Sequence, residues 1–174
     1  MDKDVMTNAF RSLDAKLKVS AQILIGGGAA MIFAHNVNLS TMDIDGLLIN
    51  TPLTASELDP LVKKVAKELK INPHWFNSYF NTFTYTIPPD YKERLISIYK
   101  GKNLEVLALG LEDLLIMKCF SGREKDIGHA KALIKRGANL KFVEDHIERL
   151  KSKGVPNGGK ALDFFDDIRE QEGV

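Results

Sequence analysis

The segments Ile25-Gly26-Gly27-Gly28 and Thr41-Met42-Asp43-Ile44-Asp45 decide the fold of this chain. The first segment ends a short apolar run, residues 21–25, and precedes residues 29–33, which suit a helix. This order predicts a strand, a glycine turn and the start of a helix. The second segment opens the largely apolar run 42–49, which we expect to form another strand.

Helical patterns and a hairpin surround these two segments. Residues 5–17 place apolar side chains near helical spacing, and residues 56–70 do so with lysines on the other face. Two β-rich runs, 95–99 and 104–109, are separated by a Lys-Gly-Lys-Asn turn and predict a hairpin. From residue 111 onward the pattern is helical, with helices expected at 111–120, 123–135, 142–151 and 160–168.

These elements indicate an α/β (α+β) protein with a mixed sheet of about four to five strands, flanked by helices and followed by a C-terminal helical extension. We expect a core over residues 1–110 and a helical region over residues 111–174, packed together as one compact unit. The aromatic stretch after Pro73 has no assigned secondary structure. Its residues Trp75, Phe76, Tyr79 and Phe80 have spacings compatible with the buried side of a helix, and the alternative is an acceptor or base-stacking surface.

The composition sets limits on location and partners. The formal net charge is +1, from 24 basic and 23 acidic residues, so no global field favours nucleic acid or an acidic membrane surface. Cys119 is the single cysteine and cannot form an intramolecular disulfide, and the N-terminal residues carry charges where a secretory signal would be apolar. The apolar stretches are too short or too rich in glycine to cross a bilayer. We therefore expect a cytoplasmic protein without a membrane partner.

Asp43 and Asp45 carry the clearest chemical signal. On a strand, residues two apart project from the same face, so both carboxylates would lie side by side while Ile44 points into the core. Two like charges so close are unfavourable unless a cation lies between them, and Mg²⁺ or Mn²⁺ takes oxygen ligands of this kind. The pair therefore predicts a metal site, although an Asp-x-Asp taken alone is more often a solvated polar face.

The glycine turn adds a second element of a site. Glycine lets backbone amides approach a phosphate closely, and a helix start offers N–H groups with a favourable dipole. A triple glycine alone is more often a tight turn, but its order and separation from the aspartates favour a site for a metal-bound nucleoside triphosphate. The reaction that fits is in-line attack on the α-phosphorus.

The two segments together resemble the signature of the nucleotidyltransferase superfamily, whose fold resembles the catalytic domain of DNA polymerase β. Three further segments are similar to the predicted bacterial nucleotidyltransferases of the DUF6036 branch, related to the AbiEii and MenA-type toxins of toxin–antitoxin pairs. They are Pro-Asp-Tyr-Lys-Glu-Arg-Leu at 89–95, Leu-Glu-Asp-Leu-Leu-Ile-Met-Lys at 111–118 and Ser-Gly-Arg-Glu-Lys-Asp at 121–126. The resemblance covers residues 5–137.

The resemblance implies roles for the residues of the first two segments. Gly26 and Gly27 would hold the triphosphate, with Thr41 beside it. Asp43 and Asp45 would be the metal ligands and catalytic residues. The substrate implied is an NTP bound with Mg²⁺ or Mn²⁺.

The resemblance also implies roles for four later residues. Lys118 and Asp126 match a lysine and an aspartate that act near the nucleotide in the toxin relatives. Arg123 and Lys125 would supply positive charge near the phosphates. The alternative for Arg123, Lys125 and Asp126 is a surface ion pair in a solvated turn.

The chain departs from these relatives at three points. It lacks the arginine that commonly precedes Thr-x-Asp-x-Asp, and no third carboxylate matches, although Asp90, Glu93 and Glu105 lie near the expected region. His129 stands near the position of a second aspartate that the relatives often carry. Three functions stay open. The first function is transfer of a nucleoside monophosphate to an RNA such as a tRNA end, to a protein or to a small molecule. The second is a catalytically silent nucleotide-binding or interaction module, and the third is a metal-dependent phosphohydrolase.

Partners follow from the same resemblance. The toxin relatives imply an RNA or protein acceptor and a cognate antitoxin. The basic surface that would dock an RNA acceptor consists of Lys63, Lys64, Lys67 and Lys70, all on one helix face.

Overall fold

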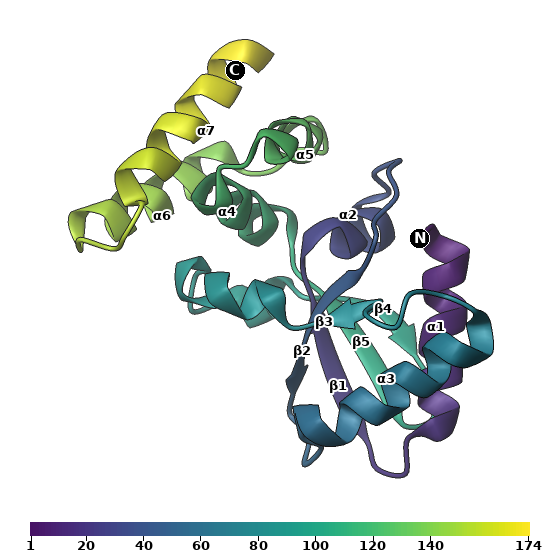
Figure 1. Ribbon diagram of the computed structural model, residues 1–174. Coiled ribbons are helices and arrows are strands. Elements are labelled where there is room, and N and C mark those ends of the chain that lie inside the picture. Colours follow the sequence, from purple (N-terminus) through teal and green to yellow (C-terminus); the bar gives the residue numbers. More distant parts are fainter. The chain divides into compact units, whose positions relative to one another are not determined.

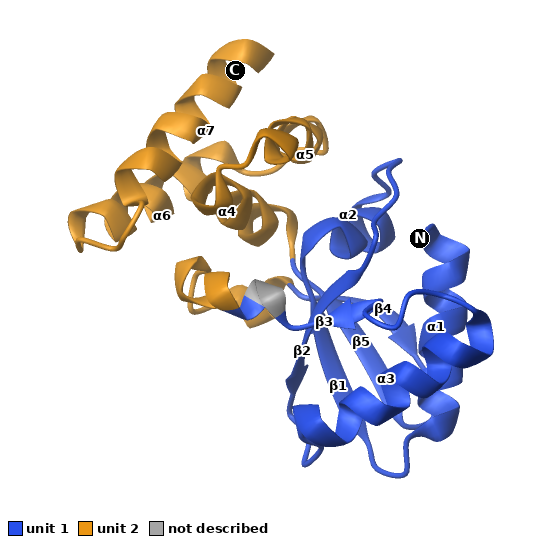
Figure 2. Ribbon diagram, in the orientation of Figure 1, with its two compact units in different colours: residues 1–81, 95–109 blue, residues 82–94, 110–174 orange. Residues whose placement is uncertain are grey.

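The computed structural model describes residues 1–78 and 81–174, and the chain divides into two compact units (Figure 2). Unit 1 comprises Met1–Asn81 and Leu95–Leu109. Unit 2 comprises Thr82–Arg94 and Gly110–Val174. The sequence suggested a boundary near residue 110, and the contacts also group residues 82–94 with the later helices.

Unit 1 is built on a five-stranded mixed sheet with the order β3-β2-β1-β5-β4, as the fold-class prediction required (Figure 1). The central strand β1 pairs antiparallel with β2 and parallel with β5. At the two edges, β3 pairs parallel with β2, and β4 pairs antiparallel with β5. The elements of this unit are α1 (Lys3–Lys16), β1 (Ala21–Ile25), α2 (Gly27–His35), β2 (Ile44–Ile49), α3 (Ala55–Leu69), β3 (Phe76–Asn77), β4 (Ile96–Lys100) and β5 (Leu104–Ala108).

One face of this sheet is covered by α1 and α3, which pack side by side in Figure 1. Ile23 of β1 and Val106 of β5 are paired in register on that face, and both are fully buried. Tyr99 of β4 pairs with Val106, and its ring lies 5.9 Å from that of Phe10 on α1. Since side chains alternate along a strand, Asp45 of β2 projects from the opposite face.

The aromatic stretch after Pro73 contains a buried tryptophan followed by a short strand. Trp75 is fully buried, and its indole N–H donates to the carbonyl oxygen of Val62 on α3 at 3.0 Å, so its predicted core position is confirmed. Phe76 belongs to the short strand β3, so the suggested helix is wrong there because main-chain pairing with β2 holds the segment extended. Tyr79 and Phe80 lie outside the described residues.

The predicted hairpin of β4 and β5 is present, and α1 anchors its turn. The backbone N–H groups of Lys102, Asn103 and Leu104 donate to the Asp14 carboxylate at 3.0, 2.7 and 2.7 Å. Burial opposes the charge of Asp14, but these hydrogen bonds hold its pKa below the ordinary value. A Cβ at Gly101 would lie 2.3 Å from Asp14 Oδ2, so only glycine fits at this turn.

Unit 2 is a bundle of α-helices with two 3₁₀ helices before it. Arg94 donates to the fully buried Asp113 through Nη2 at 2.8 Å and Nε at 3.2 Å. This bidentate pair joins two of the segments that carried the sequence resemblance, 89–95 and 111–118. The elements are η1 (Tyr79–Thr86), which belongs to this unit from Thr82 onward, η2 (Tyr91–Arg94), α4 (Leu111–Ser121), α5 (Glu124–Lys135), α6 (Leu140–Ser152) and α7 (Gly158–Glu172).

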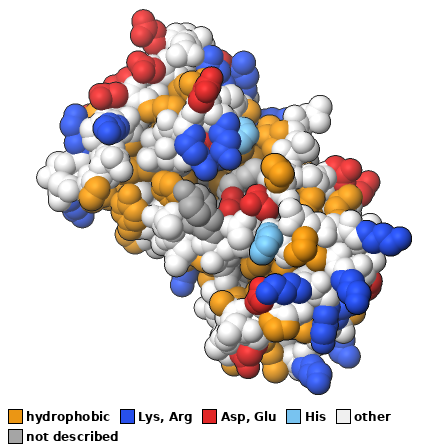
Figure 3. Space-filling model, in the orientation of Figure 1, with side chains coloured by type: hydrophobic (Ala, Val, Ile, Leu, Met, Phe, Trp, Pro, Cys, Tyr) orange, Lys and Arg blue, Asp and Glu red, His pale blue; other side chains and the backbone are white. Residues whose placement is uncertain are grey.

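The surface carries mixed charge. Figure 3 shows acidic and basic side chains interspersed over both units, in agreement with the small net charge of +1. Among the helices formed by the described residues, none is both long enough and apolar enough to cross a membrane.

Candidate functional site

The glycine turn and the two aspartates meet at the C-terminal end of β1 in unit 1. The N–H of Gly26 donates to the carbonyl oxygen of Asp45 at 2.9 Å, which ties the turn to β2. Helix α2 begins at the next residue, Gly27. Segments that are separate in the sequence therefore form one local structure.

The Asp45 carboxylate lies directly against the start of α2. A Cβ at Gly27 would be 2.4 Å from Asp45 Oδ2, and Gly27 has a φ of +58°, which disfavours any residue with a Cβ. A Cβ at Gly28 would be 3.2 Å from Thr41 Oγ1, a tight contact. The glycines therefore let an acidic side chain and the first turn of a helix approach more closely than other residues would allow.

Asp43 is held on the same face of the sheet as Asp45. The Asn77 Nδ2 amide donates to Asp43 Oδ2 at 2.8 Å, and Asn77 is the register partner of Asp45 across β2 and β3. Paired residues of neighbouring strands project from the same face, so Asp45 and Asn77 lie there together. Asp43 comes directly before β2, which begins at Ile44 and not at residue 42 as expected, and it joins them through its hydrogen bond from Asn77. The hydroxyl of Thr41 donates to the Asp43 carbonyl oxygen at 2.9 Å and fixes the backbone that enters β2.

Asn77 is a site residue that the sequence reasoning missed. It lies in the aromatic stretch without an assigned secondary structure, and nothing in the local pattern distinguishes it. Its place depends on the pairing of β3 with β2, which brings it to Asp43, 34 positions earlier in the sequence.

The residues present fit a small divalent cation. Asp43 and Asp45 offer carboxylate oxygens, the ligands that Mg²⁺ prefers, and both are partly exposed. In the described part of the chain, no group of three or more His, Cys, Asp or Glu side chains is arranged to hold a metal. Mg²⁺ in nucleotide sites is commonly bound by one or two carboxylates together with substrate phosphates and waters, so a pair is sufficient.

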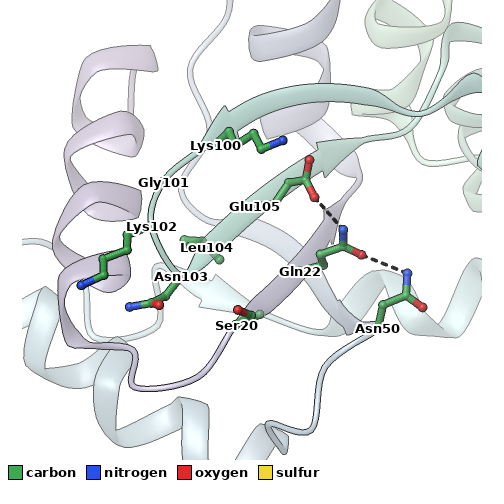
Figure 4. Close-up of a pocket in the computed structure, with 10 residues that line it drawn as sticks. Ser20, Gln22, Asn50, Lys100, Gly101, Lys102, Asn103, Leu104 and Glu105 are labelled. Atoms are coloured by element: carbon green, nitrogen blue, oxygen red, sulfur yellow. Dashed lines mark hydrogen bonds between the residues drawn. The ribbon is translucent and has the colours of Figure 1, made fainter.

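Glu105 does not complete this pair. It is in register with Gln22, whose Nε2 donates to Glu105 Oε2 at 2.6 Å, and Gln22 in turn accepts from Asn50 at 2.9 Å (Figure 4). Gln22 precedes Gly26 by four residues, about 13 Å along an extended strand. Glu105 therefore lines a separate polar cavity of about 510 Å³ at the other end of the sheet.

In unit 2, the buried side chains of Lys118 and Asp126 form an ionic network with the exposed Arg123. Lys118 Nζ donates to Asp126 Oδ1 at 2.7 Å, and Arg123 Nε donates to Asp126 Oδ2 at 2.8 Å. Burial alone would raise the pKa of Asp126, but the nearby His129 ring, whose Nδ1 lies 3.6 Å from Asp126 Oδ1, the hydrogen bond from Arg123 and the charge of Lys118 hold that pKa well below its ordinary value. Asp126 is therefore an ionised anchor, while Lys125 is exposed.

The predicted residues thus fall into two groups. Gly26, Gly27, Thr41, Asp43 and Asp45 come together in unit 1, and Lys118, Arg123 and Asp126 come together in unit 2. Asp90 is paired with Arg94 within unit 2, and Glu93 lies in η2 of the same unit.

Comparison with known families gives a match over most of the chain. The family model described as a nucleotidyltransferase of unknown function (DUF6036) matches residues 4–156. No curated protein and no solved structure matched the chain. Because the match spans most of its length, the chain belongs to this nucleotidyltransferase family.

Proposed function

We propose that this chain is a metal-dependent enzyme that moves a nucleoside monophosphate from an NTP to an acceptor hydroxyl. The observation that carries the proposal is the contact of the Asp45 carboxylate with the backbone of Gly27 at the start of α2. It puts a cation ligand and a phosphate-binding helix terminus within a few ångströms of each other. Membership of the nucleotidyltransferase family supports the general kind of chemistry.

The chain's own groups account for binding of the nucleotide. The first N–H groups of α2 have no intrahelical partners and carry a partial positive charge, which suits the triphosphate oxygens. Gly27 and Gly28 place no side chain in the way. Asp43 and Asp45 would hold Mg²⁺ or Mn²⁺, which when bound supplies positive charge to offset the charge on the phosphates.

The NTP and the acceptor hydroxyl together supply every atom that the transfer step needs. The acceptor oxygen forms a bond to the α-phosphorus, and the bond from that phosphorus to the oxygen bridging the β-phosphorus breaks. Pyrophosphate leaves, and the hydroxyl proton passes to a carboxylate of Asp43 or Asp45 or to solvent. Asn77 donates to one oxygen of Asp43 and so restrains the orientation of that carboxylate.

A catalytically silent nucleotide-binding module is the second candidate. The observation that favours it is the binding of Glu105 to Gln22, which leaves the pair without a third carboxylate from β5. A toxin role with a cognate antitoxin rests on the sequence resemblance alone.

The test is transfer of label from each α-³²P NTP, with Mg²⁺, to acceptors in a cell extract. The matched control is the double variant Asp43→Asn/Asp45→Asn, which keeps the side-chain size and removes both charges. We expect label in a discrete product with the wild type only, and loss of Mg²⁺-dependent NTP binding in the variant. Nucleotide affinity that is unchanged in the variant would refute the roles given to these aspartates, and binding without any transfer would favour the silent module.

A further inference from the structure

We infer that Asn77 limits this site to one divalent cation in the nucleotide complex, and that an aspartate in its place would let the site hold two. This rests on the proposed function, because the cation concerned is the one that Asp43 and Asp45 would bind. The side chains that the neighbouring strands bring to the face of Asp45 supply the reason.

Asn77 is the side chain that β3 places beside the aspartates. Strand β3 pairs parallel with β2, and Asn77 is in register with Asp45, so both side chains project from the same face. The Asn77 Nδ2 amide donates to Asp43 Oδ2 at 2.8 Å. An uncharged amide therefore touches one aspartate and neighbours the other, at the point from which β3 could contribute a ligand.

The strands on the other side of β2 bring hydrocarbon to this part of the face. Leu47 follows Asp45 by two residues on β2 and so shares its face. Leu47 pairs with Leu24 of β1, and Leu24 pairs with Leu107 of β5. Leucine side chains offer no oxygen to a cation, so Asn77 decides whether a neighbouring strand adds charge to the pair.

The negative charge of the site matches one divalent cation. Within the described part of the chain, no third acidic side chain joins Asp43 and Asp45 in an arrangement that could hold a metal, and Glu105 is bound to Gln22. Two ionised carboxylates carry two negative charges, which one Mg²⁺ or Mn²⁺ offsets. The start of α2 lies against Asp45, and its partial positive charge offsets part of that negative charge as well.

A second cation would need a further anionic ligand from the protein. The two cations of a two-metal site lie roughly 3.5–4 Å apart, where they repel each other strongly. The triphosphate of an NTP adds negative charge, but it shares the first cation with the carboxylates. An aspartate at position 77 would supply the missing charge with almost no change of side-chain size, because it exchanges only the amide nitrogen for an oxygen.

The test counts Mn²⁺ by electron paramagnetic resonance in a one-to-one complex of the protein with an α,β-methylene NTP. This analogue cannot react, because a carbon replaces the oxygen that bridges the α- and β-phosphorus atoms. We expect one Mn²⁺ per complex in the wild type, and two in Asn77→Asp with the spectrum of a spin-coupled pair. Without nucleotide, Asn77→Asp should bind its first Mn²⁺ about tenfold more tightly, since affinity follows the charge of the ligands.

Asn72→Asp is the matched control. Asn72 is exposed, lies five residues before Asn77, and accepts from the backbone N–H of His74 through Oδ1 at 2.8 Å, a role that an aspartate keeps. It adds the same charge outside the site and should leave the count at one. Asn77→Ala, which adds no charge, should also bind one Mn²⁺.

Urea unfolding shows whether Asn77→Asp is folded. Three carboxylates on one face repel each other, so this variant should be less stable than the wild type in a chelator and should recover stability when Mn²⁺ is added. The wild-type count does not depend on the folding of any variant. Two spin-coupled ions in the wild type, one ion in a folded Asn77→Asp, or an equal gain in Asn72→Asp would overturn the inference. If neither Mn²⁺ nor its complex with the analogue binds the wild type, the proposed function fails instead.

Discussion

Replacing Gly27 by alanine tests the geometry on which the proposed site depends. The added Cβ would lie 2.4 Å from Asp45 Oδ2, whereas such atoms pack at roughly 3.5 Å, so the carboxylate must move by about 1 Å. The residue also keeps a φ of +58°, which costs an alanine about 1–2 kcal/mol. We expect a loss of stability above that range and a loss of Mn²⁺ affinity of about tenfold or more, as for displaced supports of metal ligands.

Two other glycines serve as controls that separate the effect of a positive φ from the effect of the contact with Asp45. Gly122 has a φ of +56° but only an ordinary contact of 3.6 Å to the Cys119 carbonyl oxygen, so Gly122→Ala should cost about 1–2 kcal/mol without affecting the metal. Gly128, in α5, has nothing within 4 Å of an added Cβ, and Gly128→Ala should stabilise by up to about 1 kcal/mol.

The assays are urea unfolding for stability and titration of Mn²⁺ by electron paramagnetic resonance for binding. A Gly27→Ala protein that binds Mn²⁺ like the wild type, and loses no more stability than Gly122→Ala, would refute the argument. That result would mean that the Asp45 carboxylate is free to turn away from α2 and that the glycine turn does not shape the site.

Three further outcomes follow from the same structure. Asn77→Ala should weaken Mn²⁺ binding while circular dichroism stays unchanged, because Asp43 loses the donor that orients it; equal affinity would exclude this role. Arg94→Ala should cost about 3 kcal/mol in urea unfolding, since it leaves the fully buried Asp113 without its partner. The pKa of Asp126 is lowered in the folded state, so its stabilisation is present at neutral pH and is lost as pH falls below about 4 toward that lowered value. Asp126→Asn should therefore show a flatter decline of unfolding free energy on acidification, and an unchanged slope would contradict the ion-paired assignment.

Local patterns were sufficient for much of the secondary structure. The strand at 21–25 and the hairpin of β4 and β5 were predicted from residue type and short spacing, and the structure contains both. Of the expected glycine turn only Gly26 lies outside a regular element, because α2 already begins at Gly27. The helices of unit 2 were predicted from their periodicity, with α6 and α7 beginning two residues earlier than expected. Hydrophobic period and turn chemistry act over a few residues, so they can be read directly from the sequence.

Residue types and spacing alone place Asp43 and Asp45 two residues apart at the entry to a strand, after a run of glycines. The residues that join them depend on the folded sheet. The partner of Asp43 is Asn77, 34 positions away, and the partner of Glu105 is Gln22, 83 positions away. Strand order and register set these pairs. Both depend on how the whole sheet buries its apolar face, and no local pattern encodes them.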